Sequence, residues 1–145
     1  MRAACWRSLY PAGSGSRESI FFFTPADFSQ QLAYMEHPAG KLIAPHVHNP
    51  VPREVQYTQE VLFIRKGRLR VDFYGHQQCY LRSHVLEAGD VILLIEGGHG
   101  FEVLEDLEMI EVKQGPYAGE QDKTRFEGIN CARVRLAPEM ADGGE

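Results

Sequence analysis

The chain has 145 residues, a length typical of one domain. A hydrophobic fraction of 43% and a charged fraction of 24% are typical of a globular protein, and they exclude collagen, a coiled coil and a wholly disordered chain. The formal net charge of −5 argues against nucleic acid as the main partner, because binding to phosphates needs a clustered basic surface. The longest apolar run, Val91–Ile95, is too short to cross a membrane.

The cysteine content indicates the compartment. Cys5, Cys79 and Cys131 are widely spaced, odd in number and form no CxxC motif. This pattern favours neither a disulfide framework nor a structural zinc site, and it indicates a reducing environment. The N-terminal residues contain arginines but no apolar stretch typical of a secretory signal. We therefore expect a cytoplasmic protein.

Three segments of the chain differ in composition. Residues 1–18 end in a stretch rich in glycine, serine and proline, which predicts a flexible N-terminal arm. Residues 19–127 contain short strand-like runs separated by turn residues every 8–12 residues or so, a pattern typical of an antiparallel sandwich or barrel. One short helical pattern is expected within this domain, over 25–31, with Thr24 as its N-cap. Residues 128–145 are predicted to form a C-terminal tail.

The clearest predicted hairpin has its turn at Lys66-Gly67 and joins strands over 58–65 and 68–74. Apolar residues occupy every second position of 68–74, which is the period of a half-buried strand. The same alternation gives the preceding strand an inward face that begins with Glu60 and continues with apolar residues. A carboxylate in that position is costly to bury unless it is paired or bound to a cation.

Two closely spaced histidines, His46 and His48, are the most informative local feature. On a strand both imidazoles would project from the same face, roughly 7 Å apart along the backbone. Two imidazoles on one side can offer two nitrogen ligands to a transition metal. The chain has 6 histidines, so a pair of ordinary surface or hydrogen-bonded histidines is the alternative. A third, His99, follows the buried strand predicted over 91–95.

These residues resemble the two motifs of the cupin superfamily. The first motif is matched, in chain order, by Gly40, His46, His48, Glu60 and Gly67. The spacing agrees with the motif from Gly40 to His46 and from Glu60 to Gly67. The second motif is matched approximately by Gly89, Gly97 and His99. The resemblance covers about residues 30–115, so it includes most of the domain. It implies an all-β fold, an antiparallel double-stranded β-helix or jelly-roll barrel.

The resemblance also implies a metal site. The family's ligands, carried over to this chain, are His46, His48, Glu60 and His99, which would hold one divalent transition metal (iron, manganese, nickel or zinc). The chain departs from the family pattern because residues 49–59 lengthen the gap before Glu60 and because the second motif lacks its proline and asparagine. The longer gap predicts a loop at the mouth of the barrel. The alternative is a barrel that keeps these residues and binds metal poorly.

Other polar residues are candidates for contact with a ligand. If Met109 faces inward, so do Glu111 and Lys113, which predicts either a general acid/base or an anion contact beside the metal, or else a salt-bridged strand end. Lys123 and Arg125 suit a carboxylate or phosphate, although solvation is the commoner role of such a pair. Core packing is the expected role of the strand aromatics, which are Tyr57, Phe63, Phe73, Phe101 and Phe126, although outward ones such as Phe63 could form a dimer interface.

Two classes of function follow from the resemblance. The first is an enzyme that acts on a small polar molecule, a carbohydrate or small organic acid, by metal-dependent oxygenation, isomerisation or related chemistry. The alternative is a non-catalytic domain that binds or senses a small molecule. The expected partners are that small molecule and a second copy of the chain in a homodimer, without nucleic acid or membrane.

Overall fold

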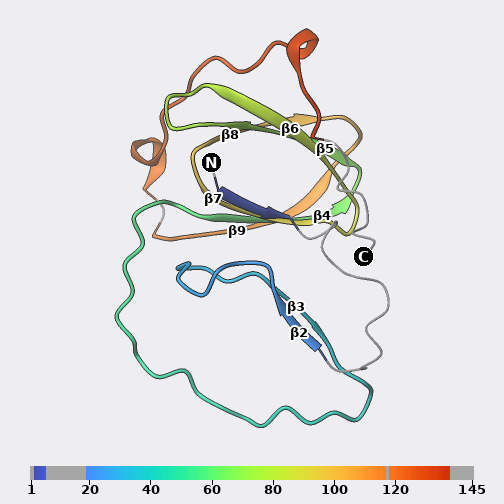
Figure 1. Cartoon of the computed structure of the whole chain (residues 1–145), viewed down its shortest axis with the longest axis vertical. Helices are drawn as coiled ribbons and strands as arrows, with labels where there is room; N and C mark the ends of the chain where they lie inside the picture. The colour runs from blue at the N-terminus through green and yellow to red at the C-terminus, as the bar shows by residue number, and fades with distance from the viewer. Residues whose placement is uncertain (1, 6–18, 117, 138–145) are drawn as a thin grey trace.

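The computed structural model describes residues 2–5, 19–116 and 118–137 (Figure 1), and these form an all-β protein. The strands are β1 (Arg2–Cys5), β2 (Ser19–Phe22), β3 (Ala33–Glu36), β4 (Glu60–Lys66), β5 (Arg68–Tyr74), β6 (Tyr80–Glu87), β7 (Val91–Glu96), β8 (Gly98–Val103) and β9 (Glu108–Lys113). Two short 3-10 helices follow them, η1 (Gly119–Asp122) and η2 (Cys131–Arg133). The described residues contain no helix with the length and apolar character needed to span a membrane.

The strands form three antiparallel sheets. The first has the order β1-β7-β4-β9, the second β6-β5-β8, and the third is the hairpin β2-β3. In Figure 1 the two larger sheets lie as two layers, and the hairpin lies outside the layer that contains β4 and β9. The prediction of an all-β antiparallel fold is therefore confirmed. The predicted flexible arm includes β1, which pairs with β7, and residues 6–18 of that arm lie outside the described residues.

The hydrophobic core lies between the two larger sheets. Its buried members are Leu62, Ile64, Leu69, Val71, Phe73, Leu86, Ile92 and Leu94. The alternation expected for β4 is confirmed, since Glu60, Leu62 and Ile64 are all buried. Full burial of such an apolar side chain contributes about 1.5–3 kcal/mol to the stability of the fold. The packing of Leu62 and Ile64 therefore fixes the position of β4, the strand that carries Glu60.

The predicted hairpin across Lys66-Gly67 is wrong. Both strands exist, but β4 belongs to the first sheet and β5 to the second, and Gly67 alone connects them. A hairpin needs a loop of at least two residues, so a single residue can only turn the chain from one sheet into the other. Gly67 does this with a φ of 81°, and Gly97 connects β7 to β8 in the same way with a φ of 85°. Glycine adopts such values without steric cost.

The second sheet is covered on its outer face by the C-terminal segment, residues 128–137, which was expected to be part of a tail. Ser83 donates its backbone N–H to Arg135 over 2.8 Å, and the Tyr80 hydroxyl bonds to the backbone of Arg135. Beneath this segment lie two buried charged residues, Arg70 and Asp72, joined by hydrogen bonds of 2.8 and 3.0 Å. Because these charges are paired, the segment can cover them without leaving either one uncompensated.

The helix expected over residues 25–31 is absent, and this segment is a series of turns and bends. The hydroxyl of Thr24 bonds to the Gln31 side chain over 2.8 Å and accepts the backbone N–H of Leu32 over 3.1 Å. The Gln31 amide in turn donates to the backbone oxygens of Pro25 and Phe28. Side-chain hydrogen bonds of this kind give the backbone an alternative to a helix. Thr24 therefore closes a loop and does not cap a helix.

Candidate functional site

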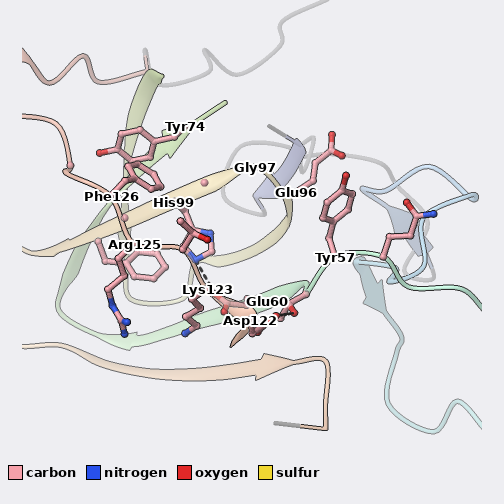
Figure 2. A pocket seen from close by; sticks show the side chains of 17 residues that line it. Tyr57, Glu60, Tyr74, Glu96, Gly97, His99, Asp122, Lys123, Arg125 and Phe126 are labelled. Carbon is pink, nitrogen blue, oxygen red and sulfur yellow. Dashed lines mark hydrogen bonds and ion pairs between the residues drawn. The ribbon is translucent and has the colours of Figure 1, made fainter. Parts of the chain in front are cut away.

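The candidate site is a cavity of about 630 Å³ between the two larger sheets, on the side where β8 forms an edge (Figure 2). Its walls come from the beginning of β4, the first residues of β8, the loop end 56–58 and the segment 122–128. The volume lies within the range of roughly 300–1,000 Å³ that is typical of pockets for small molecules. Polar and aromatic side chains line it together, which is typical of a site for a polar ligand with a ring or carbon skeleton.

A carboxylate and an imidazole meet in the wall of this cavity. The Oε2 atom of Glu60 lies 3.1 Å from Nε2 of His99, as the dashed line in Figure 2 marks. Glu60 begins β4 of the first sheet, and His99 is the second residue of β8 in the second sheet. Gly97 turns the chain between the sheets, which places His99 opposite Phe73, a core residue of β5. The pair therefore connects the two layers at the cavity.

Glu60 is an ionised carboxylate at neutral pH. Its side chain is only 8% exposed, and such burial by itself would raise its pKa. The hydrogen bond from His99 has the larger effect and lowers the pKa of Glu60 below its ordinary value, with help from the positive charges of Lys113 and Lys123. An ionised carboxylate only accepts hydrogen bonds, so Nε2 of His99 carries a proton in this contact. In the neutral imidazole Nδ1 is then left as a proton acceptor.

Glu111 and Lys113, expected to face inward from β9, form an ion pair beside Glu60. Nζ of Lys113 lies 2.7 Å from Oε1 of Glu111 and 3.8 Å from Oε1 of Glu60. The hydrogen bond to Glu111 raises the pKa of Lys113, so its ammonium stays charged. Neither residue lines the large cavity. Glu111 is exposed, and the arrangement matches the salt-bridged strand end that the sequence gave as one alternative. A role of the pair as a general acid/base or an anion contact stays a prediction.

His46 and His48 lie apart from this pair. They belong to the segment 37–59, which has no strand before Glu60, and both are exposed. Their rings contact each other at a centroid distance of 5.2 Å, and Nδ1 of His46 lies 3.1 Å from the backbone oxygen of Ala44. The expectation that the two histidines share one face of a strand is therefore wrong. In Figure 1 the segment runs well away from both layers.

The four predicted metal ligands thus meet only in part. Glu60 and His99 are together, but no group of three or more histidine, cysteine or acidic residues among the described residues has the geometry to hold a metal ion. A divalent transition metal at a site of this kind needs three or four protein ligands. The arrangement of these four residues therefore does not fit the implied metal.

The segment that carries the two histidines is nevertheless tied to the cavity at its far end. The Thr58 hydroxyl donates to Oδ1 of Asp122 over 2.8 Å, and Tyr57 lies in the cavity wall. Tyr57 is nine positions after His48 in the sequence, and a fully extended chain of that length spans at most about 30 Å. The chain length therefore permits the histidines to reach the cavity if the segment changes its conformation.

Several aromatic residues that we expected in the core line the cavity instead. Tyr57, Phe101 and Phe126 do so, together with Tyr74, whereas Phe73 packs in the core as expected. The rings of Tyr74 and Phe126 meet edge to face at a centroid distance of 5.0 Å. The glycines beside His99 were the signal in the sequence that could have indicated these contacts, because a glycine within a strand often marks the close approach of another group. A Cβ atom at Gly98 would lie only 3.0 Å from the Phe126 ring.

Comparison of the chain with protein-family models, curated proteins and solved structures finds no match. The resemblance to the cupin superfamily therefore rests on the sequence motifs alone. The cavity and the Glu60–His99 contact are the observations from which a function can be argued.

Proposed function

We propose that this protein is an enzyme that binds a small polar molecule, a carbohydrate or small organic acid, in the cavity beside Glu60 and His99. The observation that carries the proposal is the contact between a buried carboxylate and an imidazole in the wall of a cavity of about 630 Å³. Ionisable groups paired inside a cleft are typical of functional sites. The motifs of the sequence further support the proposal that the two facing sheets form a cupin-type jelly-roll barrel.

The surroundings of the pair suit a ligand with hydroxyl groups. Tyr57, Phe101 and Phe126 offer aromatic surface, while Thr124 and Asp122 offer hydrogen-bonding groups along the same cavity. A sugar or hydroxy acid presents both C–H surfaces and hydroxyls, so it complements a wall of this mixed character. The side chain of His99 is 27% exposed, so a ligand can reach it from the cavity.

The chemistry that this pair supports is proton transfer. Glu60 holds the His99 ring in one orientation through the hydrogen bond to Nε2, as a carboxylate orients the imidazole of a catalytic dyad. The imidazole can then take a proton from a ligand hydroxyl, or from a carbon next to a carbonyl group, and return it elsewhere. Removal and return of a proton is the central step of an isomerisation. A positioned general base of this kind contributes typically 10²–10⁴-fold to a rate.

A second candidate function is a domain that binds or senses the same small molecule without reacting with it. The position of His46 and His48 favours this candidate, because these residues lie outside the cavity. Metal binding by His46, His48, Glu60 and His99 remains a prediction of the sequence. The oxygenation chemistry that it implies depends on all four residues meeting at one point.

The experiment that tests the proposal measures binding and proton exchange separately. The wild type and His99→Gln are titrated calorimetrically with D-glucose, D-galactose, their uronic acids and L-malate, and each mixture in D2O is followed by NMR for deuterium incorporation. Glu60→Gln is compared with Glu108→Gln, the same change at an exposed residue of β9. We expect His99→Gln to lower the exchange rate at least 100-fold while it changes affinity far less.

Each other outcome counts for or against a defined part of the proposal. Binding that depends on His99 without any exchange or product would support the non-catalytic candidate and overturn the enzyme. Equal losses for Glu60→Gln and Glu108→Gln would show that the cavity pair has no special role. Absence of binding by every compound would overturn the proposed substrate class.

A further inference from the structure

A second, smaller cavity adjoins the site. It has a volume of about 230 Å³ and shares the loop end 56–58, Asp122 and Lys123 with the large cavity. Its remaining wall comes from Val55, the end of β9 at Lys113 and the segment 114–119. The hydrogen bond between Thr58 and Asp122 joins the two segments that both cavities share, so it lies where the cavities adjoin.

Lys123 supplies a positive charge at this junction, and this charge acts on Glu60 and Glu120 without direct contact. Its side chain lines both cavities, and within the described part of the chain Nζ makes no hydrogen bond or ion pair. The ammonium of Lys113, which also lines the small cavity, is by contrast occupied by Glu111 and Glu60. The guanidinium of Arg125 is bound by both carboxylate oxygens of Glu120. Lys123 is therefore the cation that remains available to a ligand.

The charge and shape of this junction select a carboxylate. A phosphate group carries more charge and is typically held by arginine forks or several cations. Here one ammonium is available, and the wall of the large cavity already contains three acidic residues, Glu60, Glu96 and Asp122, which disfavour a second negative charge on the ligand. We infer that the ligand is an organic acid of the uronic or hydroxy acid type, whose carboxylate pairs with Lys123 while its hydroxylated end lies against Glu60 and His99. This inference rests on the proposed function and narrows its substrate class.

The test compares matched acids and neutral sugars. D-glucuronate is paired with D-glucose and D-galacturonate with D-galactose, because each pair differs in a carboxylate at one carbon. Affinities are measured calorimetrically for the wild type, Lys123→Gln, Lys123→Arg and Lys66→Gln, the last being an exposed lysine at the end of β4. The titrations are repeated at high salt.

We expect the wild type to prefer each acid about tenfold, the lower end of the range for a hydrogen bond to a charged group, because Lys123 is exposed. Lys123→Gln should abolish this preference, because it lowers the affinity for each acid relative to the matching neutral sugar. Lys123→Arg should retain it, and Lys66→Gln should leave it unchanged. High salt should reduce the preference in the wild type, since screening weakens an exposed pair.

The outcomes distinguish this inference from the proposed function. If the neutral sugars bind through His99 but the acids bind no better, or if Lys123→Gln keeps the preference, the inference is overturned and the proposed function stands. If neither acids nor sugars bind, the proposed function and the inference are both overturned.

Discussion

Replacement of Gly67 by alanine should destabilise the protein more than the same replacement at Gly89. Both glycines have a positive φ, 81° and 96°, so each substitution places an L-residue in the left-handed region, at about 1–2 kcal/mol. At Gly89 a Cβ atom would meet nothing within 4 Å. At Gly67 it would lie 2.1 Å from the backbone oxygen of Asp106, so the backbone must move. Such overpacking adds about 1–3 kcal/mol.

The two variants form a matched pair, because the entropy change of the unfolded chain is the same for both. Urea unfolding followed by circular dichroism should give a free energy of unfolding lowered by about 1–2 kcal/mol for Gly89→Ala and by about 2–5 kcal/mol for Gly67→Ala. The extra loss should lower the melting temperature by roughly a further 2–12 °C for a domain of this size. Equal losses would refute the claim that Gly67 turns the chain against Asp106 between the two sheets.

Three further predictions concern the covered sheet face and the metal. Asp72→Ala should lower the free energy of unfolding by about 3 kcal/mol, because it leaves the buried Arg70 only its ion pair with the more exposed Glu102; a loss below 1 kcal/mol would contradict the buried pair. Tyr80→Phe should speed amide exchange over 131–137 by about tenfold, because it removes the hydroxyl that bonds to Arg135; unchanged exchange would mean that these bonds do not hold the segment. The predicted metal site requires that the wild type retain one equivalent of Ni²⁺ or Mn²⁺ after dialysis and that His46→Ala lose it, as mass spectrometry of the metal can check; a full equivalent on the variant would remove His46 from the ligand set.

The sequence allowed half of the candidate site to be predicted. Strand alternation identified Glu60 at the head of an inward face, and the run of apolar residues before Gly97 placed His99 at the start of the next strand. Alternation and an apolar run are both local patterns, and such patterns are reliable where a strand is buried. The contact between the two residues joins different sheets, and no local pattern contains that information.

The predictions that were wrong concern the strand at His46 and His48 and the hairpin at Gly67. The spacing of His46 and His48 suits a strand, but Pro38, Pro45, Pro50 and Pro52 surround them. Proline cannot donate a hydrogen bond to a neighbouring strand, so this segment cannot pair along its length. Turn residues likewise predicted that the chain reverses at Gly67, but they do not reveal which strand pairs with which.

The aromatic residues of the cavity were hidden for a similar reason. Tyr74 directly follows Phe73, at a position where the alternation of β5 predicts an outward polar residue, and Phe126 follows a polar stretch that has no regular period. Their meeting over Gly98 brings together segments that are far apart along the chain, and it depends on how the C-terminal part returns across the second sheet. Long-range returns of this kind are set by packing of the whole domain.

Because Glu60 and His99 belong to opposite layers, a molecule bound against both of them would link the two layers of the domain. The frequency with which the layers open would then depend on whether the cavity is occupied, even at residues far from the cavity. Some amides of β4 and β8 exchange hydrogen only when the layers separate, and their exchange should slow together once the molecule is bound. This slowing gives a readout of binding that requires no knowledge of the reaction.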